Sequence, residues 1–285
     1  MQPFINIEHL EKKIDDFTLG PIDFLIEPGT ITALVGDNGS GKSTLLKIIM
    51  DLVNADKGQI DRFGLLEKEG DWKKDLAYQP QTVVGYDAFT GEDLHQLISH
   101  WYPTWDEKLF LHIINELHVP LNKKFGKLSQ GVQQKLTLAL TLPRNAKVLM
   151  LDEPTSFMDI PSKKIVVDLL VDWMEKEERA IILASHQAED IKKLADFIVL
   201  LRSGKMLGLF EKESLTEKYR KYWVTGLPGF ETIPGEVFRA EHEVISNQPD
   251  LSEQYFAAHD ITPMNSMTPD LEEMITLILA NKMDM

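Results

Sequence analysis

Hydrophobic positions divide this chain into stretches with different spacing. Between residues 5 and 26 apolar residues nearly alternate with polar ones, which predicts antiparallel strands with one buried face. Residues 31–35, 148–151 and 180–184 are continuous apolar runs, typical of strands that are buried on both faces. From about residue 90 to residue 143 the apolar residues recur at helical spacing.

This order of elements predicts an α/β fold with a mostly parallel sheet and flanking helices, because buried strands alternate with helices. An antiparallel β subdomain near the N-terminus and an inserted α-helical subdomain at about residues 82–143 complete the predicted core. After about residue 226 the composition changes, and short strand-like pieces are separated by Pro-Gly pairs. We therefore predict a main domain over residues 1–225 and a small C-terminal segment over residues 226–285.

The first buried run leads into a glycine-rich loop and then into a helical pattern. The loop reads G-x-x-x-x-G-K-S, and the residues expected to surround a phosphate chain are Gly36, Asn38, Gly39, Ser40, Gly41, Lys42, Ser43 and Thr44. A strand, this loop and a helix in that order indicate a nucleoside triphosphate site. Glycines let successive backbone N–H groups face the phosphates, and the helix adds its positive end. We expect Lys42 to reach the β- and γ-phosphates and Ser43 to hold Mg²⁺.

Three further strand ends carry polar side chains that suit the same ligand. Gln81 follows one predicted strand, Asp152 and Glu153 follow another, and His186 follows a third. Ligands of open α/β sheets bind at the carboxyl ends of the strands, so we expect these groups to meet at one ATP site. Asp152 and Gln81 are expected to ligate Mg²⁺ together with Ser43. Glu153 is expected to act as the general base, while His186 is expected to contact the γ-phosphate and Gln81 to sense it.

Composition limits the partners of this predicted ATPase. The 285 residues include 45 acidic and 30 basic ones, and the net charge of −15 repels nucleic acid and anionic lipid. We therefore expect no nucleic-acid partner. The chain has no cysteine, which excludes disulfides and thiolate metal sites and is typical of a cytosolic protein. No apolar run approaches the roughly 18 residues of a membrane span, and no signal peptide is expected.

With these motifs in this order, the sequence resembles the ATP-binding subunits of ABC transporters over residues 1 to about 215. Residues 36–44 resemble the Walker A loop, and the Walker B aspartate and catalytic glutamate correspond to Asp152 and Glu153. Gln81 resembles the Q-loop glutamine and His186 the switch histidine. The resemblance implies that residues 1–225 form an ABC ATPase domain that uses ATP and Mg²⁺.

Two more motifs carry the part of the resemblance that involves a second chain. Residues 128–132, Leu-Ser-Gln-Gly-Val, resemble the family signature, and residues 156–159 resemble the D-loop. The resemblance implies that Ser129, Gly131 and Asp159 help to complete the ATP site of a partner ATPase chain, in a homo- or heterodimer. Gln130 and Val132 depart from the usual signature. Ser129 also suits the cap of the helix that follows.

The resemblance also implies a separate membrane permease, to which the chain would bind on the inner face of the cell membrane. Residues 102–106 and 268–273 look like those of ABC-2-type exporters of Gram-positive bacteria, which handle peptides, antibiotics or related compounds. The tryptophans at 101 and 105 form either a docking surface for the permease or local core. The expected function is therefore to energise export through the permease.

The base of the nucleotide has no evident stacking partner. In the family an aromatic residue would stack on adenine near Lys13 or Ile14, and neither is aromatic. Phe17 is the nearest substitute. We expect weak discrimination between adenine and other bases.

Two other classes of protein remain as alternatives. One is a soluble ABC ATPase that acts on the ribosome or DNA, but the chain has one phosphate loop and no room for a long coiled-coil insertion before residue 128. The other is a nucleotide-binding regulator without turnover, which Glu153 and His186 argue against.

An N-K-x-D sequence at residues 281–284 is of the type that reads guanine in GTPases. The apolar residues before it have helical spacing, and Thr268 followed by Pro269 suits a helix start. We therefore expect a helix there and no guanine recognition.

Overall fold

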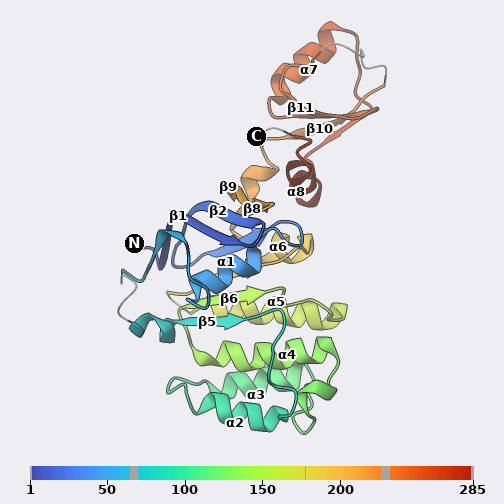
Figure 1. Cartoon of the computed structure of the whole chain (residues 1–285). Helices are drawn as coiled ribbons and strands as arrows, with labels where there is room; N and C mark the ends of the chain where they lie inside the picture. The colour runs from blue at the N-terminus through green and yellow to red at the C-terminus, as the bar shows by residue number, and fades with distance from the viewer. Residues whose placement is uncertain (1, 65–69, 177, 226–231, 284–285) are drawn as a thin grey trace. The chain divides into compact units, whose positions relative to one another are not determined.

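The computed structural model describes residues 2–64, 70–176, 178–225 and 232–283, which form two compact units divided between Leu207 and Gly208 (Figure 1). The strands are β1 (Ile5–Ile14), β2 (Phe17–Ile26), β3 (Ile31–Val35), β4 (Lys57–Arg62), β5 (Leu76–Gln79), β6 (Val148–Asp152), β7 (Ala180–Ala184), β8 (Phe197–Arg202), β9 (Lys205–Glu211), β10 (Arg220–Trp223), β11 (Glu236–Arg239), β12 (Glu243–Ser246) and β13 (Asn265–Met267). The α-helices are α1 (Lys42–Ile49), α2 (Gly91–Ser99), α3 (Glu107–Glu116), α4 (Gln130–Thr141), α5 (Ile160–Met174), α6 (Ala188–Leu194), α7 (Pro249–Ala258) and α8 (Leu271–Leu279). Short 3₁₀ helices are η1 (Gly70–Asp75), η2 (Phe125–Lys127), η3 (Leu142–Arg144) and η4 (Glu213–Leu215).

A six-stranded sheet in the order β5-β6-β7-β3-β8-β9 forms the centre of the first unit. The strands from β5 to β8 in this order are parallel, and every residue of β3, β6 and β7 is buried. Ser203 and Gly204, with φ of 48° and 83°, turn the chain from β8 into β9 in the manner of a type I′ hairpin. Three other strands form an antiparallel sheet in the order β2-β1-β4.

Alternate residues of the parallel sheet pack into two different cores, because successive side chains of a strand point to opposite faces. Leu149 and Leu151 belong to the core shared with α2, α3, α4 and α5. Met150 and Ile182 belong to the core shared with the antiparallel sheet and α1. Burial on both faces explains the continuous apolar runs. The predicted fold class is confirmed, including the antiparallel β subdomain and the inserted helices.

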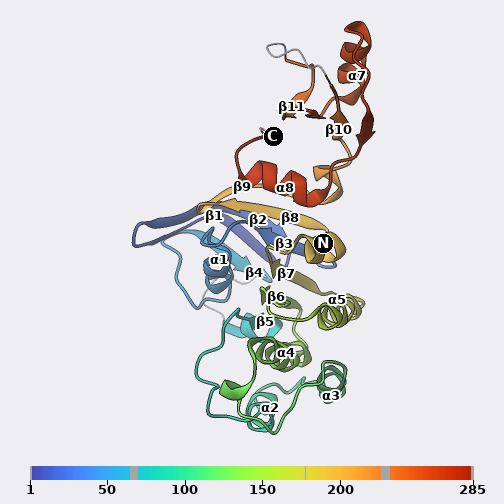
Figure 2. The same ribbon diagram turned by 90° about the vertical axis from the view of Figure 1, so that its right-hand side faces the viewer.

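The helical subdomain lies next to the edge strand β5, where Figures 1 and 2 both show α2, α3 and α4 side by side. Ser129 is the residue that precedes α4, as predicted, but its side chain accepts no capping hydrogen bond, so the predicted capping bond is wrong. The helix begins through the backbone alone, because the Gln133 N–H donates to the Ser129 carbonyl at 2.9 Å.

The two tryptophans of the aromatic cluster have different environments. The Trp105 ring packs 5.7 Å from the Phe110 ring, and its Nε1–H donates to Glu107 Oε2 at 2.9 Å. Trp101 is 73% exposed. Trp105 is therefore partly buried against the core, and Trp101 is the more exposed of the two tryptophans.

The second unit contains an antiparallel sheet in the order β11-β12-β10-β13. Tyr222, Val244 and Phe256 are among the residues of its small buried core. Strand β10 pairs with β12 and β13, so it belongs to this sheet. The predicted boundary between residues 225 and 226 stays a prediction, and the compact units divide after Leu207. Pro228 and Gly229, on which part of that prediction rested, lie outside the described residues.

Helix α8 ends two residues before Asn281, so a helix rather than a strand precedes the N-K-x-D sequence, as expected. The predicted cap at Thr268 is wrong, because the helix starts later and the Asp270 side chain accepts from the Glu272 N–H at 3.1 Å. Asp284 lies outside the described residues.

Candidate functional site

The glycine-rich loop connects β3 to α1, and two of its glycines have no substitute. A Cβ atom on Gly36 would lie 2.1 Å from the Leu201 carbonyl oxygen, which is closer than any contact tolerates. Gly41 has a φ of 106° and directly precedes α1. The loop therefore closes tightly around the positive end of α1, where an anion is favoured.

Lys42 is buried at the start of α1 and has its ammonium group inside the loop. Its Nζ donates to the main-chain oxygens of Gly36 at 2.6 Å and Asp37 at 3.1 Å. Burial lowers the pKa of Lys42, while the charges of Glu153 and Asp152 raise it. A phosphate group near this lysine would oppose the effect of burial, because an opposite charge favours the ammonium form.

A cavity of about 620 Å³ lies between this loop and the ends of β5 and β6, and this volume is within the range of small-molecule sites. It is lined by Ile14, Phe17, Asn38, Gly39, Ser40, Gly41, Lys42, Ser43, Thr44, Gln81, Asp152 and Glu153. The structure thus brings the predicted phosphate-loop residues together with three of the four predicted strand-end groups. Gly36 contributes to the loop without lining the cavity.

Asp152 ends β6 and has properties that suit a cation ligand. Its carboxylate is buried, and Oδ1 has no hydrogen-bond partner among the described protein groups. Burial raises the pKa of Asp152, whereas a hydrogen bond with Ser43 lowers it. An orphan carboxylate oxygen inside a protein is unfavourable, and a hard cation with oxygen ligands would satisfy it.

The donor set around Asp152 fits Mg²⁺ only if the nucleotide contributes ligands. The described part of the chain contains no cluster of three or more His, Cys, Asp or Glu side chains that could hold a metal. Ser43 and Gln81, which line the same cavity, add a hydroxyl and an amide oxygen. This small set is typical of Mg²⁺ sites completed by phosphate oxygens and water.

Glu153 follows Asp152 in a strained backbone conformation, with a φ of 52° that non-glycine residues rarely adopt. Its N–H donates to the Ala184 carbonyl at 2.9 Å, and its Oε1 lies 2.7 Å from His186 Nδ1. Because β6 and β7 are parallel neighbours, the residues beyond their ends meet, as the sequence predicted. His186 therefore contacts Glu153 directly but does not line the cavity.

A polar network supports the turn after Glu153, and the sequence analysis missed it. The Thr155 hydroxyl donates to Asp190, and Gln187 Nε2 donates to Thr155 Oγ1 at 3.0 Å. Lys163 in turn donates to the side chain of Gln187. These bonds join the residue after His186 to the turn that holds Glu153. The sequence contained one signal for this network, because polar residues follow closely after the predicted catalytic residues Glu153 and His186.

Ser129, Gly131 and Asp159 do not line the cavity. A Cβ atom on Gly131 would lie 2.4 Å from the Phe157 carbonyl oxygen, so the start of α4 packs closely on the turn after β6. Asp159 caps α5 by accepting from the Ser162 N–H at 2.8 Å. Hydrogen bonding with Ser162 lowers the pKa of Asp159 to about 2. One chain by itself therefore presents two separate sets of predicted site residues.

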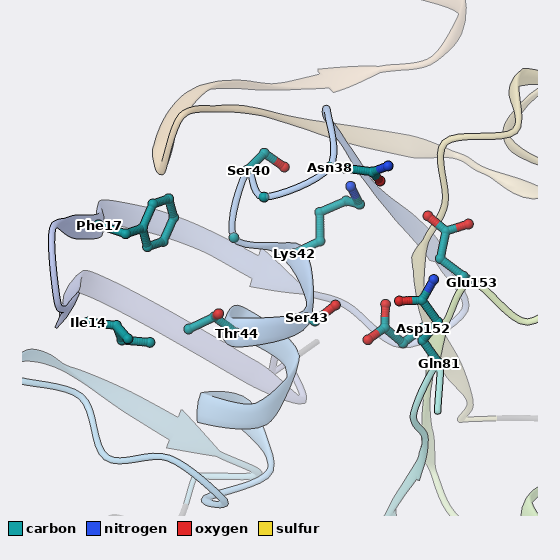
Figure 3. Close-up of a pocket in the computed structure, with 12 residues that line it drawn as sticks. Ile14, Phe17, Asn38, Ser40, Lys42, Ser43, Thr44, Gln81, Asp152 and Glu153 are labelled. Carbon is teal, nitrogen blue, oxygen red and sulfur yellow. The ribbon is translucent and has the colours of Figure 1, made fainter. Parts of the chain in front are cut away.

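Phe17 and Ile14 line the cavity on the side of the phosphate loop that is opposite to Glu153 (Figure 3). Phe17 begins β2 and Ile14 ends β1, so both lie at the hairpin that joins these strands. This is where a base would extend if the phosphates occupied the loop.

Among the described residues, none of the helices combines the length and the apolar character required to cross a membrane.

A family model described as "ABC transporter" matches residues 19–156. The ABC transporter ATP-binding protein YtrB of Bacillus subtilis is 31% identical over 76% of this chain and 75% of its own length.

Other relatives have names that indicate different cargoes. A probable metal transport system ATP-binding protein of Chlamydia muridarum is 32% identical over 70% of this chain and 82% of its own length. The SkfA peptide export ATP-binding protein SkfE of Bacillus subtilis is 30% identical over 65% of this chain and 80% of its own length. A solved structure of the ATP binding subunit of an ABC transporter matches with a TM-score of 0.67 at 22% identity. The match covers 74% of this chain and 91% of that chain, and it concerns the fold alone.

Proposed function

We propose that this chain drives an exporter. The premise is that the chain belongs to the ABC transporter family, as an ATP-binding subunit with transport-coupled ATPase activity. The cargo of this exporter would be a peptide, an antibiotic or a related compound. The observation that carries the ATPase part is that Lys42, Asp152 and Glu153 line one cavity, while His186 holds the Glu153 carboxylate at 2.7 Å.

Each side chain of the cavity has a role that follows from its chemistry. Lys42 binds the phosphates of ATP, and Ser43, Gln81 and Asp152 would hold Mg²⁺, which neutralises phosphate charge when bound. The Glu153 carboxylate accepts the proton of the attacking water. His186 fixes the orientation of that carboxylate through the bond at Nδ1. Phosphoryl transfer depends mainly on such positioning and charge neutralisation.

A second ATPase chain is required to bring Ser129, Gly131 and Asp159 to a nucleotide, because the cavity of their own chain excludes them. Phe157 and Ile160, next to Asp159, are 64% and 84% exposed. Exposed apolar side chains that lie close together indicate a surface that a partner covers. The partner would be another copy of this chain or a related ATPase.

Exposed apolar side chains in the helical subdomain support docking to a separate membrane permease. Val84, Leu97 and Trp101 are large apolar residues that remain exposed there. Bound in this way, the chain would be peripheral on the inner face of the membrane. The choice of export rests on residues 102–106 and 268–273, which look like those of ABC-2-type exporters, and on the relative named for peptide export.

Trp101→Glu tests the docking and transport parts together. The chain is co-expressed with the multi-span permease of a neighbouring gene, and co-purification from membranes and export of the cargo are measured. We expect both to be lost, because the charge opposes burial at the interface, while ATP affinity and thermal stability remain those of the parent. Val171→Glu, at an exposed apolar position of α5, is the matched control. Normal docking and export with Trp101→Glu would refute the assignment.

A further inference from the structure

A groove in the second unit lies between helix α7 and the edge strand β13. Its volume is about 420 Å³, which is within the range of small-molecule sites. It is lined by Tyr222, Glu253, Phe256, Ala257, Ile261, Thr262, Pro263, Asn265 and Ser266. All these residues belong to the second unit, and none of them lines the nucleotide cavity. The groove is therefore a separate feature that the ATPase function leaves unexplained.

The floor of the groove continues the face of the sheet that α7 covers. Tyr222 pairs with Val244 on one side and with Ser266 on the other, so the three side chains point to the same face. Tyr222 and Val244 belong to the small core together with Phe256, whereas Ser266 is exposed. The short serine side chain leaves space at the position where a larger side chain would continue the core.

Glu253 places an oriented negative charge on the helix side of the groove. The buried Tyr222 hydroxyl donates to Glu253 Oε1 at 2.9 Å. Burial raises the pKa of Tyr222 and the hydrogen bond with Glu253 raises it further, so the phenol stays the donor and the carboxylate the acceptor. In the described part of the chain, Glu253 forms no ion pair with a basic side chain, and no lysine or arginine lines the groove. The carboxylate thus suits a cation that the second unit does not supply.

Strand β13 forms the other side of the groove and has an unpaired backbone edge among the described residues. It ends the sheet order β11-β12-β10-β13, so β10 alone pairs with it, and all three of its residues are exposed. Such an edge directs N–H and C=O groups outward, where an extended segment can pair with them. Met264 and Met267, on either side of Ser266, are 65% and 49% exposed. Methionine side chains adapt readily to the surface of a partner.

The charge of the second unit decides which occupant suits this edge. Residues 208–285 contain more than twice as many acidic as basic residues. A second copy would bring the same excess of negative charge, and like charges oppose such pairing. A small amine would satisfy Glu253 but would leave the edge of β13 and the two methionines uncovered. An extended segment with a basic side chain satisfies all three.

We propose that the groove binds an extended segment of a partner protein, which adds a strand to β13 and places a lysine or arginine side chain against Glu253. Backbone pairing gives a complex of this kind its affinity, and pockets for alternate side chains give it specificity. The cationic side chain donates to the carboxylate in a charge-assisted hydrogen bond. The inference goes beyond the proposed function and does not depend on it, because every residue that it uses lies in the second unit.

The test titrates the full chain into a fluorescent peptide, Thr-Val-Thr-Lys-Thr-Val-Thr with blocked ends, and follows the anisotropy. Alternate residues of a strand point to opposite sides, so the lysine and both valines share one face of this peptide. We expect saturable binding that is lost when glutamate replaces the lysine. N-methylation of either alternate set of residues blocks one backbone edge of the peptide. We expect one of these two methylated forms to lose binding and the other to keep it.

Protein variants tie the binding to the groove. Glu253→Gln keeps an acceptor for the Tyr222 hydroxyl and removes the charge, so we expect it to weaken peptide binding by about fivefold, the upper range for an exposed ion pair. Ser266→Phe fills the floor of the groove and should abolish binding. Glu241→Gln removes an exposed acid of the same unit outside the groove, and this matched control should bind like the parent.

Hydrogen exchange locates the peptide without any substitution. Adding the lysine peptide to the parent should slow exchange of the amides in residues 264–267, because the new strand covers them. The glutamate peptide should leave their exchange unchanged. Thermal unfolding of the variants shows whether each is folded, and Glu253→Gln should have the Tm of the parent.

Several results would overturn the inference. The absence of saturable binding by the parent would remove the site, and equal binding of both methylated forms and the unmethylated peptide would exclude strand addition. Equal affinity for lysinamide would show that the groove takes a small amine. Undiminished binding by folded Ser266→Phe and Glu253→Gln would show that the peptide adheres elsewhere on the acidic surface. Self-association of the parent without ATP or peptide, abolished by Ser266→Phe, would assign the edge to a second copy.

Discussion

Replacing Glu153 by glutamine tests the catalytic assignment at its centre. The amide has nearly the shape of the carboxylate, and its oxygen can still accept from His186 Nδ1 in the place of Oε1, which lies 2.7 Å away. The strained backbone at φ 52° is held by the bond from the Glu153 N–H to Ala184, which the substitution leaves intact. We therefore expect the variant to fold and to bind ATP like the parent.

The expected loss of hydrolysis follows from the lost proton acceptor. A general base contributes about 10²–10⁴-fold to such a rate, which corresponds to about 2.7–5.4 kcal/mol in activation free energy. Because Glu153 is buried beside the cavity, bulk water cannot easily take the place of its carboxylate as the proton acceptor. Binding contacts remain, so two ATP molecules should stay trapped between two chains.

The assay combines phosphate release with sizing of the protein in ATP and Mg²⁺. The variant should run as a dimer with ATP and as a monomer with ADP if the partner is a second copy of this chain. Adding Ser129→Arg should abolish the dimer while ATP stays bound to the monomer. Glu189→Gln, an exposed acid on α6, is the matched control and should hydrolyse ATP normally. Parent-level hydrolysis by Glu153→Gln would refute the base assignment, and a dimer of the double variant would refute the sandwich.

Three further expectations can be measured directly. Lys42→Ala should weaken ATP binding by about 100-fold, since a hydrogen bond to a charged group contributes up to about 3 kcal/mol; unchanged calorimetric affinity would contradict the phosphate-loop assignment. ATP and GTP should compete within about tenfold, because a stacking contact of about 1–3 kcal/mol with Phe17 suits either purine; a preference above a hundredfold would show that another side chain reads the base. The stability that Asp159 adds by capping α5 should be present above pH about 4 and fade as the pH falls toward its folded pKa of about 2. The difference in Tm between the parent and Asp159→Ala, followed against pH, measures this loss, and a difference that grows on acidification would contradict it.

The strands and the cavity were predictable because their signals are local. A strand buried on both faces requires continuous apolar residues, and polar residues such as Asp152 and His186 at strand ends must then converge at one edge of the sheet. The hairpin at Ser203 and Gly204 was predictable for a similar reason, since its turn needs residues that tolerate positive φ. These inferences need no knowledge of distant contacts.

Two of the missed features depend on contacts that are distant in the sequence, and a third depends on local side-chain geometry. Gln134 looks like one more polar position on a helix, and only the fold shows that it reaches the Gln81 backbone. Ser129 occupies the cap position, but side-chain geometry decides whether the hydroxyl bonds to the helix, and it does not. Residues 220–223 have no pattern that assigns them to one sheet or another; pairing with β12 and β13 decides it.

Strand β9 has a consequence for anyone who shortens this chain. The strand runs from Lys205 to Glu211, while the compact units divide after Leu207, so the last strand of the six-stranded sheet continues into the second unit. A protein truncated at residue 207 would keep only three of the seven residues of β9, so the edge strand of the sheet would be incomplete. Open edges of this kind pair with other chains and promote aggregation. An isolated ATPase fragment should therefore extend at least to Glu211 if it is to stay soluble.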